Sequence, residues 1–288
     1  MKTGIGMLTN GAKQLVKKVI GAAGLEVRRL PREEPVNEVT YSAYDEQILI
    51  GQYLEQLACK ERFCVDIGAS DGTSFSNTYA LFQNGWAGLA VECDAEKFAA
   101  LAVRLKNFAG AALSRCRVTP ANVIGLLEAH GVPANFTFLS LDIDGYDYYV
   151  LEQLLERFQP SLICAEINEK IPPPIKFSVK WSPDYWWATD HFYGQSLAQL
   201  AHLGSRHDYA LTRVEFNNAF LIQRAICPVA AVTPEAAYRT GYADRPDRKK
   251  KTPWNADMEA LLTMPPQEGV EFLRKYFAKY EGKYICEL

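Results

Sequence analysis

A short glycine-containing segment follows the first strongly apolar run of the sequence and could hold a ligand. It reads Asp66-Ile67-Gly68-Ala69-Ser70-Asp71-Gly72-Thr73. Glycines allow the backbone to approach a ligand closely, and a helix that begins here offers free backbone N–H groups. The spacing matches neither the GxGxxG dinucleotide fingerprint nor the Walker A loop, so a pyrophosphate is not the favoured ligand. The carboxylate of Asp66 instead suits a ligand that carries an ammonium group.

A second acidic segment, Glu92-Cys93-Asp94, ends the next apolar run. Gly72 and Glu92 are 20 positions apart, which is the separation at which Rossmann-like sheets place an acidic residue that binds ribose hydroxyls. The two segments together predict a ligand that contains a ribose. The alternative is a pair of turn glycines followed by a solvated carboxylate.

The third segment, Asp142-Ile143-Asp144-Gly145-Tyr146-Asp147, again follows an apolar run, as does Glu166. Ligands of open α/β sheets bind outside the carboxyl ends of the strands, so Asp142, Asp144 and Glu166 are expected to face one site. These three carboxylates and His191 are candidate general bases. The carboxylates also describe a site for a hard cation such as Mg²⁺ or Ca²⁺. Capping of the following helix is the alternative role for Asp142 and Asp144.

The segments that carry these residues alternate between strand and helix patterns with short connections, which is typical of a parallel sheet covered on both faces. Two further runs separated by Asn217-Asn218 predict an antiparallel hairpin. We therefore expect an α/β fold, a doubly wound Rossmann-like seven-stranded sheet that is mostly parallel with an antiparallel closing hairpin. The predicted strands are 63–67, 88–92, 116–118, 136–141, 161–166, 209–215 and 219–224, and the predicted helices are 45–59, 73–84, 95–107, 122–130, 148–158 and 196–203.

Changes in composition along the chain predict three parts: an N-terminal helical extension (1–59), the α/β domain (60–227) and a C-terminal extension (228–288) rich in proline. The first thirty residues have the pattern of a basic amphipathic helix. Packing of this helix on the domain or on a second subunit, as in a homodimer, is favoured over peripheral contact with a membrane. The basic cluster from Arg245 to Lys251 is placed outside the site.

The composition excludes several classes of protein. The formal net charge is −3 at pH 7, so no overall positive field exists to hold nucleic acid. The histidines and cysteines lack the spacing of a structural zinc site. No apolar stretch approaches the roughly 20 residues that span a bilayer, and no signal peptide is recognised, so no transmembrane segment is expected. Seven cysteines, most of them in apolar runs, indicate a reducing compartment and a cytoplasmic protein.

The three motifs together resemble those of the class I S-adenosylmethionine-dependent methyltransferases, and most closely the FkbM-like branch of bacterial glycan and natural-product pathways. The resemblance covers about residues 60–225 and implies that the cofactor is S-adenosyl-L-methionine. One departure is Ser70, which stands where many members of the superfamily have a glycine. The resemblance implies that Asp66, Gly68, Ser70 and Gly72 surround the methionine part, that Glu92 binds the ribose, and that Cys93 and Asn122 lie around the adenine. Ala69, Asp71 and Thr73, in the same segment, are also expected to bind the cofactor.

The same resemblance implies an O-methyltransferase that acts on a sugar or other small hydroxyl-bearing acceptor. An alcohol, with a pKa of roughly 15, needs a base or a metal ion before it can attack a methyl carbon. The aromatic stretch from Trp181 to Gly194 could cover that acceptor, and packing on the core or on a second subunit is an equal alternative.

Two other functions stay open. One is a non-catalytic protein that binds the cofactor and a protein partner. The other is a phosphatase, because Asp142-x-Asp144-Gly145 also resembles the nucleophile loop of haloacid dehalogenase-type phosphatases. That family has a threonine where this chain has Tyr146, and a later pair of aspartates that this chain lacks.

Overall fold

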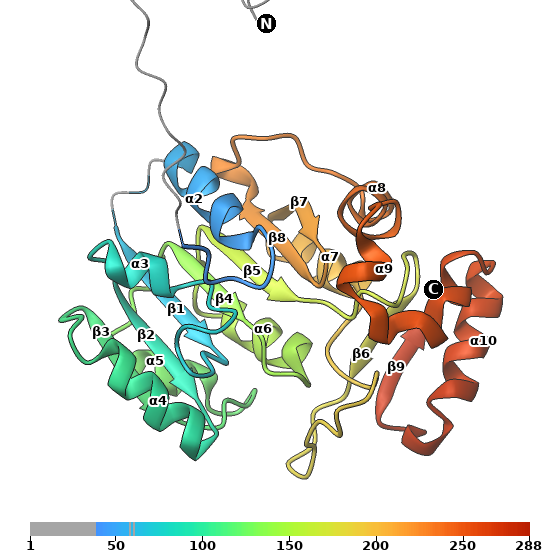
Figure 1. Ribbon diagram of the computed structural model, residues 1–288, viewed down its shortest axis with the longest axis horizontal. Coiled ribbons are helices and arrows are strands. Elements are labelled where there is room, and N and C mark those ends of the chain that lie inside the picture. Colours follow the sequence, from blue (N-terminus) through green and yellow to red (C-terminus); the bar gives the residue numbers. More distant parts are fainter. Residues whose placement is uncertain (1–38, 58, 60) are drawn as a thin grey trace, which may run out of the picture. The chain divides into compact units, whose positions relative to one another are not determined.

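A seven-stranded sheet forms the centre of the protein, in the strand order β3-β2-β1-β4-β5-β8-β7 (Figure 1). The computed structural model describes residues 39–57, 59 and 61–288. The first five strands are parallel, whereas β8 runs antiparallel to both β5 and β7. The predicted α/β class and closing hairpin are therefore confirmed. The strands are β1 (Phe63–Ile67), β2 (Ala87–Glu92), β3 (Ala111–Arg115), β4 (Phe138–Leu141), β5 (Leu162–Glu166), β7 (Tyr209–Glu215) and β8 (Asn218–Gln223).

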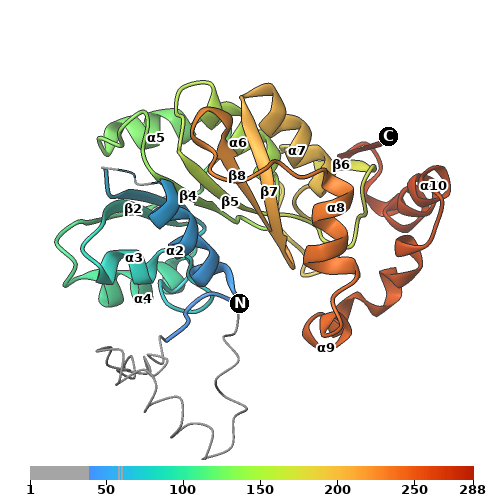
Figure 2. The same ribbon diagram turned by 90° about the horizontal axis from the view of Figure 1, so that it is seen from above.

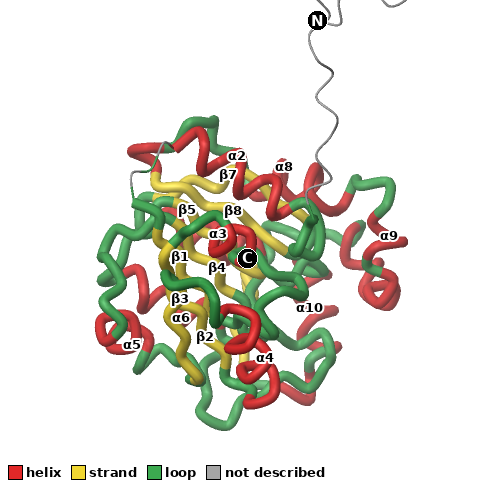
Figure 3. Tube along the Cα trace, turned by 60° about the vertical axis from the view of Figure 1, so that its left-hand side comes forward, coloured by secondary structure: helices red, strands yellow, loops and turns green. Residues whose placement is uncertain are grey.

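Helices cover both faces of the sheet because its strands are apolar on both sides. Successive side chains of a strand point to opposite faces, so Cys64 belongs to one apolar cluster and Val65 to the other. Figure 2 shows the two helical layers above and below the sheet, and Figure 3 shows the yellow strands between red helices. One layer holds α2 (Glu46–Leu57), α3 (Tyr79–Gln83) and α4 (Ala95–Leu105), and the other holds α5 (Val123–Ala129), α6 (Asp147–Leu155) and α7 (Leu197–Arg206).

Side-chain caps fix where two of these helices begin. Asp94 directly follows β2, and its carboxylate accepts hydrogen bonds from the backbone N–H groups of Glu96 and Lys97, each at 2.9 Å. At the start of α7, the side chain of Ser196 accepts a hydrogen bond from the backbone N–H of Gln199. Such caps satisfy donors that the first helical turn leaves free. The cap at Asp94 therefore fixes the short connection between β2 and α4.

Two predicted elements are wrong. The third strand is Ala111–Arg115 rather than 116–118, because an edge strand that starts with two alanines carries little apolar signal. The helix predicted over 73–84 is only Tyr79–Gln83. Its first part is instead a turn, in which Phe75 has a positive φ of 59° and Ser76 Oγ accepts from the N–H of Tyr79.

The C-terminal part contributes one strand to a second, two-stranded sheet that was not predicted. Its strands are β6 (Lys176–Val179) and β9 (Tyr284–Glu287), which pair antiparallel. A third apolar cluster, which includes Phe177 and Phe277, lies between this sheet and α10 (Pro266–Tyr276). The other elements of this part are α8 (Pro234–Tyr238), η2 (Arg239–Ala243), α9 (Arg248–Lys251), η3 (Pro253–Leu262) and η4 (Ala278–Tyr280), preceded by η1 (Arg224–Ile226).

The amphipathic helix predicted for the first thirty residues lies outside the described residues. The described chain from Thr40 to Leu288 is one compact unit. None of the helices in this part of the chain combines the length and the hydropathy needed to cross a bilayer.

Candidate functional site

The glycine segment forms a tight turn at the carboxyl end of β1. Gly68 has a φ of +93°, and a Cβ atom at this position would lie 1.6 Å from the backbone oxygen of Asp142. The N–H groups of Gly68 and Ala69 both donate to the carbonyl of Val91 in β2. Only glycine allows β1, β2 and β4 to end this close together.

Ser70 connects this turn to the acidic residue that ends β2. Its φ of 51° is in the left-handed region, and its N–H donates to Glu92 Oε2 at 2.9 Å. Glu92 Oε1 accepts from the N–H of Asp94 at 2.7 Å. The carboxylate is thus fixed by two backbone donors, and each of its oxygens retains a lone pair for a ligand.

Asp66 ends up almost fully buried beneath the turn, with an exposed fraction of 5%. Burial raises its pKa from 3.8 to about 6, although a hydrogen bond from Thr78 Oγ1 at 2.5 Å opposes the rise. A cationic group near this carboxylate would return the pKa toward its ordinary value. The predicted affinity of Asp66 for an ammonium group is therefore consistent with its surroundings.

The end of the glycine segment has a structural role. Asp71 Oδ1 accepts hydrogen bonds from the N–H groups of Thr73 and Ser74, at 2.8 and 2.7 Å. Partial burial raises the pKa of Asp71, but these bonds outweigh that effect and hold it below its ordinary range. Gly72 packs against α4, where a Cβ atom would lie 2.7 Å from Leu101. Asp71 and Gly72 therefore shape the turn without lining the pocket.

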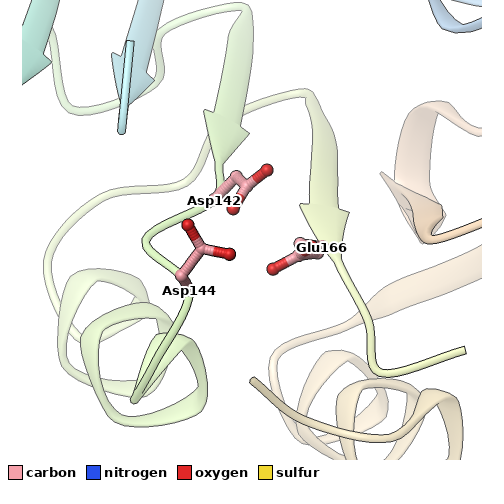
Figure 4. A group of neighbouring side chains, drawn as sticks. All are labelled: Asp142, Asp144 and Glu166. Atoms are coloured by element: carbon pink, nitrogen blue, oxygen red, sulfur yellow. The ribbon is translucent and has the colours of Figure 1, made fainter. Parts of the chain in front are cut away.

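Three carboxylates converge at the ends of β4 and β5. One carboxylate oxygen from each of Asp142, Asp144 and Glu166 lies within 4.8 Å of the other two, and Figure 4 shows the three groups pointing toward one another. Burial and then the charge of Asp144 raise the pKa of Asp142 to about 8. Burial and then the charges of Asp142 and Asp144 raise the pKa of Glu166 well above its ordinary value. Burial also raises the pKa of Asp144 to about 6, and the charge of Lys97 opposes that rise. The cluster therefore favours a bound cation or bound protons over three unpaired negative charges.

Glu166 itself lacks one partner. Its Oε1 accepts from Asn217 Nδ2 at 3.2 Å, whereas its buried Oε2 has no hydrogen-bond partner within the described residues. Asp147, by contrast, is fully satisfied, because it accepts from the N–H groups of Ile143 and Gly145 and so closes the loop that carries Asp144. A buried carboxylate oxygen without a donor is an acceptor for a cation or a proton.

A pocket of about 450 Å³ joins the glycine turn, Glu92 and the acidic loop. It lies at the carboxyl ends of the parallel strands, where open α/β sheets bind ligands. Aromatic side chains at its mouth are largely exposed, among them Phe75 at 77% and Trp186 at 66%. Of the predicted site residues, Asp66, Gly68, Ala69, Ser70, Glu92, Cys93, Asp142 and Asp144 line the pocket, and Asp71, Gly72, Thr73, Asn122, Glu166 and His191 are not in its lining.

Asn122 and His191 have other contacts. Asn122 Oδ1 accepts from the N–H of Thr119 at 2.7 Å, and its Nδ2 donates to the carbonyl of Arg117 at 3.0 Å, so it holds the pocket-lining segment from Cys116 to Val118. His191 Nε2 lies 3.0 Å from Asp257 Oδ1, in the C-terminal part. The structure does not bring this imidazole to the three carboxylates, so we do not retain His191 as a candidate base.

Arg117 was not among the predicted site residues. It lines the pocket and contacts the aromatic loop, with its Cζ 4.4 Å from the ring centroid of Trp186. Asn77 was also missed, although it lines the pocket and donates to Ser140 Oγ at 3.2 Å. Neither residue belongs to a motif, and no spacing along the chain relates residue 117 to residue 186.

No family model matches the sequence, and no curated protein matches it. Several solved structures are similar to part of the chain. Magnesium protoporphyrin IX methyltransferase from Synechocystis PCC 6803, with bound S-adenosylhomocysteine, is 9% identical with a TM-score of 0.39, and the match covers 73% of this chain and 97% of that one. A methyltransferase from Aquifex aeolicus is 12% identical with a TM-score of 0.37, and the match covers 63% of this chain and 90% of that one. The N-terminal domain of EvdMO1, in the presence of S-adenosylhomocysteine and D-fucose, is 11% identical with a TM-score of 0.41. That match covers 74% of this chain and 96% of the other. At these identities and TM-scores, function has to be argued from the site residues themselves.

Proposed function

We propose that the protein is an S-adenosylmethionine-dependent O-methyltransferase that acts on a sugar or another small hydroxyl-bearing acceptor. The observation that carries this proposal is the bond from the Ser70 N–H to Glu92 Oε2, because it holds this carboxylate beside the glycine turn, in the pocket that Asp142 also lines, where it would accept from a ribose. Binding and acid–base groups thus line one cavity, as an enzyme of this kind needs.

The cofactor would lie along the ends of β1 and β2. Its ammonium group would pair with Asp66, and its ribose hydroxyls would donate to the free lone pairs of Glu92. Cys93 and the segment from Cys116 to Val118, which line the same end of the pocket, would contact the adenine. This orientation directs the methyl group toward the ends of β4 and β5.

The acceptor hydroxyl would bind beside Asp142 and Asp144, the two carboxylates of the cluster that line the pocket. In its ionised form, either carboxylate would accept a hydrogen bond from the hydroxyl and take its proton as the oxygen attacks the methyl carbon. The exposed rings of Phe75, Trp186 and Trp187 at the pocket mouth suit the apolar face of a sugar or ring,.

We also propose that Asp142, Asp144 and Glu166 hold a divalent cation. The unpartnered, buried Oε2 of Glu166 supports this fit, and an all-oxygen donor set favours a hard ion such as Mg²⁺,. Such an ion lowers the pKa of a hydroxyl that binds to it.

The cation site is tested by calorimetric titration of the metal-free protein with Mg²⁺ and with Mn²⁺. Wild type and Glu156→Gln, a control at an exposed position, are expected to bind one ion, and Glu166→Gln to bind at least tenfold more weakly. Equal affinities of wild type and Glu166→Gln would contradict the site.

The reaction is tested by measuring S-adenosylhomocysteine formed from S-adenosylmethionine with a panel of sugars and other hydroxyl compounds. Asp142→Asn is expected to bind S-adenosylhomocysteine but to lose transfer by at least 100-fold, on the order of the usual contribution of a general base. Asp208→Asn, at an exposed position far along the sequence, is the control. Binding without transfer to any acceptor would favour the non-catalytic alternative, and phosphate release from an aryl phosphate with Mg²⁺ would favour the phosphatase.

A further inference from the structure

The segment that follows β6, residues 180–194, covers the pocket and is called the aromatic loop below. Tyr185, Trp186 and Trp187 of this loop line the pocket. Trp186 is 66% exposed and Trp187 39% exposed. A loop that presents large rings to solvent at the mouth of a pocket gains buried area when a ligand enters. Its position should therefore affect acceptor binding.

One end of the aromatic loop is fixed to the C-terminal part. The ring of Phe192 stacks on Tyr280 with centroids 3.8 Å apart. The carboxylate of Asp190 accepts hydrogen bonds from Tyr280 Oη at 2.6 Å and from Lys279 Nζ at 3.0 Å. Three contacts thus hold Asp190 and Phe192 at this end of the loop. Nearer the tip, Tyr185 Oη donates to the backbone carbonyls of Asp144 at 3.1 Å and Phe192 at 2.9 Å.

The tip is held from the opposite side by Arg117, which follows β3. Its guanidinium donates to the backbone carbonyls of Pro183, at 2.5 Å, and Tyr185. The Cζ atom also lies 4.4 Å from the ring centroid of Trp186. None of its hydrogen bonds or ion pairs within residues 39–57, 59 and 61–288 is to a carboxylate. The planar, permanently charged guanidinium is suited to bind two carbonyls and a ring at once.

The segment that carries Arg117 also borders the proposed cofactor site. Cys116 and Val118 line the pocket near Cys93, and the N–H of Cys116 donates to the carbonyl of Glu92 at 3.1 Å. A ligand at this end of the pocket therefore contacts the residues on either side of Arg117. Ligand binding and the position of the aromatic loop therefore both depend on the segment from Cys116 to Val118.

We infer that Arg117 is a positioning residue that clamps the aromatic loop over the pocket and couples loop closure to cofactor occupancy. The coupling half of this inference rests on the proposed function, whereas the clamp does not. Because coupling between two sites is reciprocal, cofactor binding favours the closed loop, and a closed loop favours the cofactor. Acceptor binding then follows cofactor binding.

The clamp is tested by limited chymotrypsin cleavage of the aromatic loop, with the cut sites identified by mass spectrometry. Without cofactor, Arg117→Met is expected to be cleaved about tenfold faster than wild type, because a charged hydrogen bond and a cation–π contact together correspond to at least that change in a local equilibrium. Arg117→Lys keeps the charge but cannot bind both carbonyls, so an intermediate rate is expected. Arg115→Met, at the exposed end of β3, is the control and should be cleaved as wild type is.

Trp186→Ala gives a second test, because replacing this exposed ring carries little risk to folding. It removes the ring that Arg117 contacts, so faster cleavage at Tyr185 and Trp187 is expected. Cleavage of both Arg117→Met and Trp186→Ala at the wild-type rate would overturn the clamp.

The coupling is tested by repeating the cleavage with saturating S-adenosylhomocysteine. The ligand is expected to slow cleavage of wild type severalfold but not that of Arg117→Met, although calorimetry finds it bound to both. Equal protection of the two proteins would overturn the coupling. If S-adenosylhomocysteine does not bind wild type at all, the proposed function and the coupling fail together, and the cofactor-free rates still decide the clamp. With an identified acceptor, Arg117→Met should raise KM much more than it lowers kcat.

Discussion

Asp66→Asn is expected to stabilise the free protein, because the carboxylate is ionised at neutral pH in a buried position. Burial raises its pKa from 3.8 to about 6. A rise of about two pKa units, at about 1.4 kcal/mol each, corresponds to a cost of about 3 kcal/mol in the free energy of folding at pH 7.5. The amide of asparagine avoids this cost and can still accept the hydrogen bond from Thr78 Oγ1.

The destabilisation by ionised Asp66 should depend on pH in a characteristic way. Since the pKa of Asp66 is higher in the folded than in the unfolded protein, the folded protein binds the proton more tightly. The cost is therefore complete above about pH 6 and disappears as the pH falls toward 4. The difference in stability between Asp66→Asn and wild type should shrink over the same interval.

Urea unfolding at pH 7.5, 6 and 5 measures this difference. Asp71→Asn is the matched control and is expected to destabilise the protein, because the pKa of Asp71 is lowered by the hydrogen bonds that it accepts. Asp66→Asn should also weaken the binding of S-adenosylhomocysteine, since the ammonium group loses its partner. The reasoning would be refuted if Asp66→Asn were no more stable than wild type at pH 7.5, or if its gain in the free energy of unfolding did not change with pH.

Two further substitutions test the glycine turn and the buried ion pair between Lys170 and Glu169, which follow β5. Gly68→Ala should destabilise the protein by roughly 3 kcal/mol or more in urea unfolding, because its Cβ atom would overlap the backbone of Asp142,. The control is Gly85→Ala, which has a similar positive φ but no atom within 4 Å and should lower the free energy of unfolding by only about 1 kcal/mol,. Equal losses for the two variants would contradict the explanation. Lys170→Met should cost about 3–5 kcal/mol because it leaves the carboxylate of Glu169 buried without its charged partner,. The double variant Lys170→Met/Glu169→Gln should recover part of that loss, and a double variant less stable than the single one would contradict the role of the ion pair.

The sequence was sufficient for the strands of the central sheet other than β3, because their signals are local. The runs Phe63–Ile67 and Leu162–Glu166 are apolar except for Asp66 and Glu166, as expected for strands buried on both faces,. The motif residues end these strands, so the rule that ligands bind at the carboxyl ends of parallel strands placed Glu92, Asp142 and Asp144 around one pocket,.

Contacts between distant parts of the chain could not be predicted in this way. Nothing in the local pattern relates Arg117 to the loop that contains Trp186, or β6 to β9 at the end of the chain. His191 was a reasonable candidate base from its residue type alone, but its imidazole faces Asp257 in the C-terminal part. Such placements depend on how loops pack, which sequence periodicity does not encode.

Calorimetric titration with S-adenosylhomocysteine tests the proposed cofactor site most directly. Wild type is expected to bind with micromolar affinity. Glu92→Gln should bind at least tenfold more weakly, because a carboxylate oxygen that accepts from the ribose is lost. Glu96→Gln, at an exposed position in α4, should bind as wild type does. No binding by folded wild-type protein, or equal binding by Glu92→Gln, would contradict the proposed cofactor site.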